Sequence, residues 1–298
     1  MYFFTPKEIA ELWQMTPQMV RRYCKEGRIK SAIQLEGNWL IPEGTPKPGS
    51  DIDDEDLLPP LAKKMLYQHA RNNHYGIYEY MQISLAYCSN RMASNRLTQK
   101  QIEDIYRTNK LCRAFEATKV DDIIEIVNHF ICMRYVMDNL TAPLTISFIK
   151  QLHQLLSYGT FGDRKHKTSV GEFRAKNSKL GIPADNIQKE LFQAAMAYER
   201  KPATLDDILE FHVALETIHP FDDYNGRVGR IIMMKECLRY GADPFIIDDK
   251  HRSAYFKGIA LWKEDPELLR AEVHRAQQYF SNKVDTCRLM QYHKHPIY

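Results

Sequence analysis

HPFDDYNGRVGR, residues 219–230, separates two helical patterns and decides how the larger part of the chain folds. The run before it, 205–218, has apolar residues at helical spacing and no helix breaker, which predicts a buried helix. Pro220 ends that helix, because the residue before a proline is pushed out of the α region. Asn225 then stands where a helix N-cap belongs, and a new apolar face runs from Val228 to the stop signal at Gly241. The sequence therefore predicts a helix, a tight loop and a second helix.

The predicted loop ends at a helix N-terminus, where proteins readily bind anions. The first N–H groups of a helix have no intrahelical partner and carry the positive end of the helix dipole. Arg227 and Arg230 are three residues apart, so both lie on one face and lean back toward that end. Two guanidiniums suit a polyphosphate better than a single phosphate. Asp223 could share a magnesium ion with phosphate oxygens, and His219 could take a proton from an attacking hydroxyl.

The residues alone leave a plainer interpretation open, in which His219 caps a helix and the two arginines are surface charges. The stretch, however, closely resembles the Fic family signature HPFx(D/E)GNGRxxR, with eleven of its twelve positions compatible. The resemblance implies a protein adenylyltransferase, an enzyme that moves AMP from Mg-ATP onto a protein hydroxyl and releases pyrophosphate. The expected partners are ATP, Mg²⁺ and a target protein with a Ser, Thr or Tyr hydroxyl, or the chain itself.

The same resemblance assigns roles within the motif. It implies that His219 is the general base and that Phe221 anchors the loop in the core. It implies that Asp223 holds the magnesium ion. The residues that it implies for ATP binding are Asn225, Gly226, Arg227 and Arg230, with Arg227 on the inner phosphates and Arg230 on the γ-phosphate.

One position departs from the signature, because Tyr224 stands where the family has its first glycine. If the backbone there needs a positive φ, a tyrosine costs on the order of 1–3 kcal/mol of local strain. If it does not, the ring merely flanks the nucleotide or the target. The substitution bears on activity and leaves the assignment of the motif in place.

A second segment, SVGEFRAKNSKLGIP (169–183), is rich in Gly, Ser, Asn and β-formers and predicts a β-hairpin between helices. It resembles the flap of Fic proteins, a hairpin over the active site with a GxxR pattern that holds the target segment by strand addition. Gly171 and Arg174 match that pattern and are the expected target-binding residues. Taken without the resemblance, the stretch is an ordinary surface loop.

A third segment, SNRMASNRLT (89–98), follows a long helical pattern at 74–88. It resembles the inhibitory-helix motif (S/T)xxxE(G/N) of autoinhibited Fic proteins, whose glutamate pairs with the second signature arginine. Aligning Ser89 and Asn95 places that glutamate at Ala93, which has no carboxylate. Either this lineage lacks the brake or regulates differently, or the glutamate was replaced on purpose. Alanine near a helix end is also adequately explained as a good helix former.

The N-terminal stretch 4–44 has a different character. It contains two short helical patterns, after Thr5-Pro6 and after Thr16-Pro17, and then a strand pair, SAIQL and WLIP. This order resembles the winged helix-turn-helix of excisionase/MerR-like DNA-binding domains, whose second helix enters the major groove. An interaction or dimerisation module of the same fold is the alternative. The basic residues expected to contact DNA are Arg21, Arg22, Lys25 and Arg28.

These segments predict a mainly α protein with two domains. A winged helix-turn-helix domain occupies 1–46, an acidic, Pro-rich linker 47–60, and a Fic-type helical core with a β-hairpin flap 61–298. The inhibitory helix falls at about 74–95. The helical patterns at 121–138, 145–157 and 252–282 show no chemistry of their own and predict scaffold.

Composition favours a cytoplasmic protein. No apolar run is long enough for a signal peptide or a membrane span, and the six cysteines lie far apart without a CxxC, which indicates reduced thiols. The net charge of +3 is too small to imply nucleic-acid binding by itself. The oligomeric state is left open.

Three other functions compete with AMP transfer. Doc-like relatives phosphorylate and differ in the second half of the signature, so Arg230 favours AMP transfer. Removal of AMP by some relatives depends on the inhibitory glutamate, and Ala93 argues against it. A different class of function is a DNA-binding transcriptional regulator with a degenerate, nucleotide-sensing Fic core, for which Tyr224 is the best support.

Overall fold

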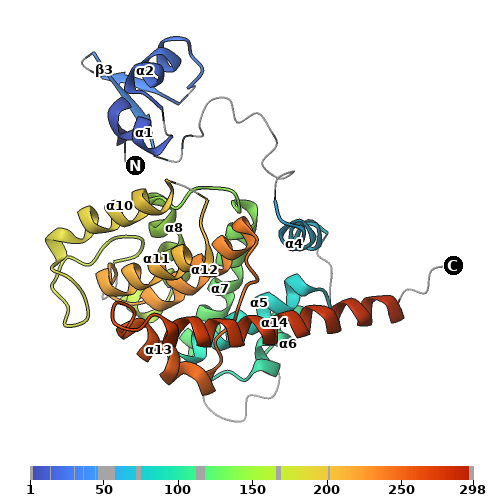
Figure 1. Ribbon diagram of the computed structural model, residues 1–298. Coiled ribbons are helices and arrows are strands. Elements are labelled where there is room, and N and C mark those ends of the chain that lie inside the picture. The colour runs from blue at the N-terminus through green and yellow to red at the C-terminus, as the bar shows by residue number, and fades with distance from the viewer. Residues whose placement is uncertain are drawn as a thin grey trace.

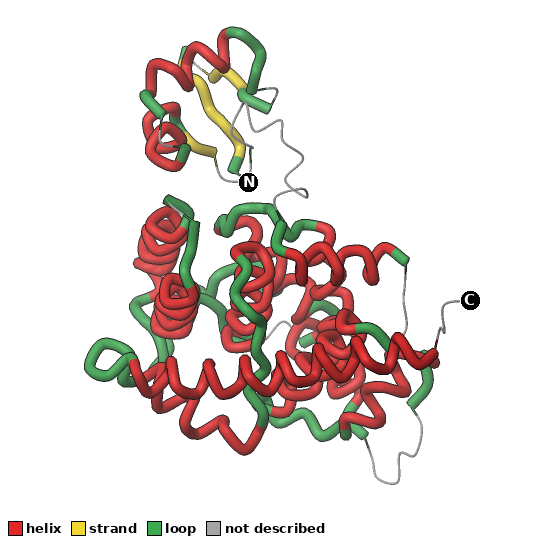
Figure 2. Tube along the Cα trace, turned by 45° about the vertical axis from the view of Figure 1, so that its right-hand side comes forward, coloured by secondary structure: helices red, strands yellow, loops and turns green. Residues whose placement is uncertain are grey.

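The computed structural model describes residues 3–13, 15–29, 31–35, 37–43, 45, 58–71, 75–111, 118–165, 169–200 and 202–294, with side chains described as far as 284. These residues form a small N-terminal module with a sheet, and a larger body of helices (Figures 1 and 2). The predicted mainly α fold is confirmed for this part of the chain.

The N-terminal module begins with β1 (Phe3–Phe4), α1 (Pro6–Leu12) and α2 (Pro17–Lys25), followed by β2 (Ile33–Leu35) and β3 (Asn38–Pro42). Both helices start where the sequence predicts, because the Thr5 and Thr16 side chains accept hydrogen bonds from the first helical turn and a proline follows each. The predicted strand pair is the antiparallel β2–β3 hairpin. Strand β1 was not predicted; it pairs with β3 and gives the sheet order β1–β3–β2.

The helical body contains α4 (Pro60–Ala70), α5 (Ile77–Arg91), α6 (Gln99–Thr108), α7 (Val120–Asp138), α8 (Ile146–Ser157), α9 (Phe161–Arg164), α10 (Ile187–Tyr198), α11 (Leu205–Ile218), α12 (Asn225–Tyr240), α13 (Arg252–Ala260) and α14 (Glu267–Lys294). Short 3₁₀ turns at Ala184–Asn186 and Asp249–His251 precede α10 and α13. Most of the predicted linker lies outside the described residues, and α4 begins at its last residue, Pro60.

Helix α12 is the centre of the body, and nearly all of its residues are buried. It contacts α4, α5, α7, α8 and α11. A helix that is covered on every side has a fixed axis and rotation. The two signature arginines on its first turns are therefore presented at a fixed place.

A buried ionic network fastens the far end of α12. The Lys235 ammonium lies 2.6 Å from Glu236 Oε1 and donates to the carbonyl of Ala142 at 2.6 Å. Glu236 also accepts from the Tyr198 hydroxyl at 3.0 Å, and Arg239 pairs with Glu199 at 2.8 Å. Burial lowers the pKa of Lys235, while the charge of Glu236 opposes that shift. Rotation of α12 would separate these partners and leave a buried charge unpaired, so the network resists it.

The N-terminal module docks on the helical body beside α8 and α10 (Figure 1). The Phe4 ring lies 5.7 Å from that of Phe192, and Met196 of α10 belongs to the module's hydrophobic cluster. Glu43 accepts hydrogen bonds from the backbone and side chain of Ser147, in the first turn of α8. A carboxylate at a helix N-terminus is favourable, so the module is attached by both apolar and polar contacts.

The predicted β-hairpin at 169–183 is wrong, because these residues form turns and bends and contain no strand. Their backbone N–H groups bond elsewhere: Gly171 N donates to His153 Nδ1 at 3.0 Å, and Arg174 N to the carbonyl of Pro220 at 2.9 Å. Close to the segment's end, Ala184 N donates to Asn177 Oδ1 at 2.8 Å. Contacts to side chains and to the signature loop thus take the donors that a two-stranded ladder would need.

Candidate active site

The loop between α11 and α12 turns twice through the left-handed region. His219 ends α11 with φ 50°, and Tyr224 precedes α12 with φ 66°. The helix starts one residue earlier than predicted: Tyr224 occupies the N-cap position and Asn225 is the first helical residue. Tyr224 therefore adopts the backbone conformation that favours glycine, at a cost of about 1–3 kcal/mol.

The centre of the loop is fixed by Phe221 and Asn225. The Phe221 ring is fully buried and stacks on His153 with centroids 3.9 Å apart. The Asn225 amide closes the loop on itself, because it accepts from Phe221 N and donates to Phe221 O, both at 2.9 Å. Phe221 is thus buried in the core as expected. The Asn225 side chain holds the loop together, and its role in nucleotide binding stays a prediction.

His219 is half-buried at the start of the loop, beside the predicted flap. Arg174 Nε donates to the His219 carbonyl at 2.8 Å, and its Nη2 donates to the carbonyl of Ile182. Gly181 is so close that a Cβ there would lie 2.8 Å from His219 Cβ. Burial lowers the pKa of His219, and the positive charge of Arg174 lowers it further. The imidazole is therefore neutral at neutral pH, which is the form that accepts a proton.

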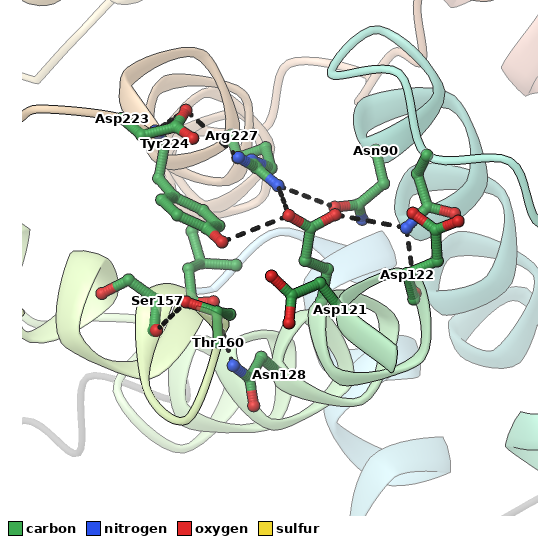
Figure 3. Close-up of polar contacts among 12 residues, drawn as sticks. Asn90, Asp121, Asp122, Asn128, Ser157, Thr160, Asp223, Tyr224 and Arg227 are labelled. Carbon is green, nitrogen blue, oxygen red and sulfur yellow. Dashed lines mark hydrogen bonds and ion pairs between the residues drawn. The ribbon is translucent and has the colours of Figure 1, made fainter. Parts of the chain in front are cut away.

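Arg227 is almost fully buried and is surrounded by acceptors and one aromatic face. Its Nη1 lies 3.0 Å from Glu125 Oε1, and its Nη2 lies 3.3 Å from Asp223 Oδ1. The guanidinium carbon lies 3.6 Å from the centroid of the Tyr224 ring. A cation over an aromatic face contributes about 0.5–2 kcal/mol, which offsets part of the strain at Tyr224. In Figure 3 the side chains of Tyr224 and Arg227 converge with that of Asn90, which comes from α5.

Arg230 contacts the segment that resembles the inhibitory motif. Its Nε donates to Ser89 Oγ at 2.9 Å, and its Nη2 donates to the Ser89 carbonyl at 3.1 Å. Ala93 is exposed and lies two residues beyond the end of α5. Asn95 is buried and donates to the carbonyl of Asp122 at 2.9 Å and to Glu125 Oε2 at 3.2 Å. The segment thus contacts Arg230 through Ser89 and Arg227 through Asn90, and it also contacts Glu125 through Asn95.

Asp223, the predicted magnesium ligand, has a side chain that is 64% exposed. Within the described ranges, no group of three or more His, Cys, Asp or Glu side chains could hold a metal ion. A single carboxylate nevertheless suits magnesium, which keeps most of its water and is completed by substrate phosphates. Asp223 and the start of α12 fit that arrangement.

Glu125 is the residue at this site that the sequence does not mark. It lies on α7, in the stretch 121–138 that the sequence predicts as scaffold, where charged residues on a helix face are ordinary.

The four basic residues predicted to contact DNA lie far from Glu125 in the chain, in the N-terminal module. Lys25, Arg21 and Arg22 line one groove there, while the Arg28 guanidinium stacks 4.2 Å from the Tyr23 ring.

Buried histidines around the site make stability depend on pH. Burial lowers the pKa of His129 to about 3, of His153 to about 4 and of His212 to about 3. The unfolded chain takes up these protons below about pH 6.5, whereas the folded chain does not until about pH 3–4. Each such histidine therefore lowers the free energy of unfolding by about 1.4 kcal/mol per pH unit as the pH falls through that window.

We expect His129→Leu to reduce the dependence of the unfolding free energy on pH by the contribution of one histidine, about 1.4 kcal/mol per pH unit. Neither His129 ring nitrogen has a hydrogen-bond partner among the described residues, so leucine removes the titrating group without breaking a bond. The measurement is the free energy of unfolding from urea titrations at several pH values. His274→Leu is the control for replacing a histidine with leucine, because His274 is exposed. Equal slopes in His129→Leu and the parent would contradict the prediction.

Part of this chain is similar to a known protein family. The Fic/DOC family profile matches residues 143–237. The Protein adenylyltransferase Fic of Drosophila melanogaster is 27% identical over 180 residues, which is 57% of this chain and 35% of the relative; that of Drosophila ananassae is 26% identical over 182 residues. The chain thus aligns with about a third of the length of these curated relatives.

Solved structures of similar fold cover more of the chain. A Fic domain containing signaling protein from Bacteroides thetaiotaomicron aligns with 78% of this chain and 91% of its own, at 17% identity and a TM-score of 0.59. Fic-1 from C. elegans aligns with 77% of this chain and 74% of its own, at 16% identity and a TM-score of 0.60. A Fic family protein from Desulfovibrio desulfuricans aligns with 96% of this chain and 76% of its own, at 18% identity and a TM-score of 0.54. At these identities the structures show the fold alone. The matched profile shows that residues 143–237 of this chain are similar to the Fic/DOC family, and the solved structures show that the fold is shared.

Proposed function

We propose that this chain is a protein adenylyltransferase, which transfers AMP from Mg-ATP to a hydroxyl side chain of a protein. The observation that carries the proposal is the α11–loop–α12 unit. One short loop presents a neutral His219 at its start, an exposed Asp223 in its middle and two buried arginines on the helix that follows. The matched family and its curated relatives support the same chemistry.

In the proposed reaction, a hydroxyl of the target attacks the α-phosphorus of ATP. The new O–P bond forms as the bond from the α-phosphorus to the pyrophosphate oxygen breaks, and the hydroxyl proton passes to the neutral imidazole of His219. Arg227 and Arg230, with the first N–H groups of α12, hold the phosphates and balance their charge. When bound at Asp223, magnesium would supply further charge neutralisation on the phosphates. Positioning and electrostatics supply most of the catalysis in phosphoryl-type transfer.

The test is transfer of label from ATP labelled at either the α- or the γ-phosphate, in the presence of magnesium. We expect label from the α-position to appear on the chain itself or on proteins of a lysate, and none from the γ-position. Label from the γ-position alone would indicate phosphorylation instead. Nucleotide binding without any transfer would favour the degenerate sensor that Tyr224 suggests.

A second function, DNA binding by the N-terminal module, is supported by a groove on its surface. The groove has a volume of about 650 Å³ and lies between α1, α2 and the β2–β3 hairpin. Its basic lining residues are Lys7, Arg21, Arg22 and Lys25, and Trp39 also contributes. Clustered cations beside a short helix suit the phosphate backbone of a duplex.

We expect the full chain to retard duplex DNA in a salt-sensitive way, and Arg21→Glu with Arg22→Glu to weaken that binding at least tenfold. Losing phosphate contacts lowers the affinity and the salt slope together. The control is Lys257→Glu with Lys263→Glu, which changes the net charge equally at exposed positions outside the groove. Binding that ignores salt, or an equal loss in both double variants, would favour the interaction-module alternative.

A further inference from the structure

Glu125 lies between two parts of the candidate site that are far apart in the sequence. One is the signature motif with Tyr224 and Arg227, and the other is the segment after α5 with Asn95. Its Oε1 lies 3.0 Å from Arg227 Nη1 and accepts from the Tyr224 hydroxyl at 3.2 Å. Its Oε2 accepts from Asn95 Nδ2 at 3.2 Å. The carboxylate thus contacts the first signature arginine, the residue in place of the family glycine and the asparagine of the segment that follows α5.

These contacts hold the carboxylate in one position. The Glu125 side chain is only 15% exposed, and Arg227 is 3% exposed, so the pair is largely shielded from solvent. Charge-assisted hydrogen bonds in such surroundings are among the stronger polar contacts in proteins. The tyrosine at position 224 contributes twice, because its ring lies under the guanidinium and its hydroxyl holds the carboxylate.

A carboxylate at this place opposes the binding of phosphate. The same guanidinium is predicted to hold the inner phosphates of ATP, and a negative charge 3.0 Å from it cancels much of its attraction for another anion. Asp223 lies 3.3 Å from the other side of the guanidinium, so Arg227 has a carboxylate on each side before any nucleotide arrives. Incoming phosphates must therefore either displace Glu125 or bind beside a neutralised arginine.

We propose that Glu125 sets the nucleotide affinity of the site by competing with the phosphates for Arg227. The inference rests on the proposed function and adds a residue to it, on a helix outside the signature. Ala93 cannot supply a carboxylate to Arg230, whereas Glu125 supplies one to Arg227 and is held by Asn95, two residues beyond Ala93. Tyr224 contacts both Arg227 and Glu125, contacts that a glycine at this position could not make.

The test compares nucleotide binding by the parent, Glu125→Gln and Tyr224→Phe, using calorimetry with magnesium and an ATP analogue that cannot be cleaved at the α-phosphate. Glutamine keeps the shape of Glu125 and an oxygen for the Tyr224 hydroxyl but removes the charge. We expect Glu125→Gln to bind about tenfold more tightly, which corresponds to about 1.4 kcal/mol. Tyr224→Phe keeps the ring, loses one donor to Glu125, and should tighten binding by a smaller factor.

The matched control is Glu103→Gln, since Glu103 also pairs with an arginine, Arg107, on α6 and should leave binding unchanged. Binding by Glu125→Gln that equals or falls below that of the parent would overturn this inference, because Glu125 would then only orient Arg227 or do nothing for it. Such a result leaves the proposed function intact. An absence of nucleotide binding in the parent and in all variants would overturn both.

Discussion

Replacing His219 with alanine is expected to lower AMP transfer by a factor of about 10²–10⁴ while nucleotide binding stays close to that of the parent. The imidazole is proposed to act on the target hydroxyl, whereas the phosphates are held by Arg227, Arg230 and the first turn of α12. Arg174 bonds the backbone carbonyl of His219, so alanine keeps that contact and the loop should keep its shape. Transfer of α-label and calorimetric binding of ATP, measured on the same preparation, separate the two effects.

The pH profile gives this prediction a second measurement. A general base works in its neutral form, so activity is lost as the pH falls through its pKa. Because burial lowers the pKa of His219, the acid limb of kcat/KM should lie below the usual range of histidine. The limb should disappear in the residual activity of His219→Ala. As a control, His251→Ala changes a partly exposed histidine that pairs with Asp248 and should keep both activity and limb. Nucleotide affinity that falls as steeply as transfer in His219→Ala would contradict the role of base.

The helix–loop–helix that carries the site could be predicted because its signals are local. The apolar periodicity of 205–218, the break at Pro220 and the stop at Gly241 each act within one or two turns of chain, and α11 and α12 follow them. The start of α12 differed by one residue. Its cause is the Asn225 side chain, which bonds back to Phe221 and leaves the N-cap position to Tyr224.

What could not be predicted depends on contacts between distant residues. The segment 169–183 has the composition of a hairpin, but Arg174 bonds the carbonyl of His219, some forty residues later, Gly181 lies close to the same residue, and no ladder forms. Glu125 is about a hundred residues from Arg227, and nothing in its own neighbourhood distinguishes it from a solvated helix residue. Strand β1 is similar, since a pair of phenylalanines becomes a strand only by pairing with β3.

Restoring a carboxylate at position 93 is expected to reduce labelling at least tenfold. Ser89, which the resemblance to the inhibitory motif places four residues before the missing glutamate, already bonds Arg230 through both its hydroxyl and its carbonyl. Ser94 has φ 71°, so the chain makes a left-handed turn between the end of α5 and Asn95. With Ala93 aligned to the inhibitory glutamate, a glutamate there reaches Arg230, takes the donor meant for the γ-phosphate and adds negative charge beside a polyanion. A charged hydrogen bond contributes roughly 1.5–3 kcal/mol, and each 1.4 kcal/mol is a factor of ten.

The comparison needed is transfer of α-label by the parent, Ala93→Glu and Ala93→Gln at the same ATP concentration. Ala93→Gln has the same length and shape but no charge, so it should label nearly as well as the parent. Position 93 is exposed, so either side chain fits there without disturbing the core. Combining Ala93→Glu with Glu125→Gln then separates the two arginines: labelling should recover in part, because the charge at Arg227 is released while the new one at Arg230 remains. Labelling by Ala93→Glu that matches the parent would mean that residues 89–95 are no inhibitory motif, and control of the site would then rest on Glu125 and α7.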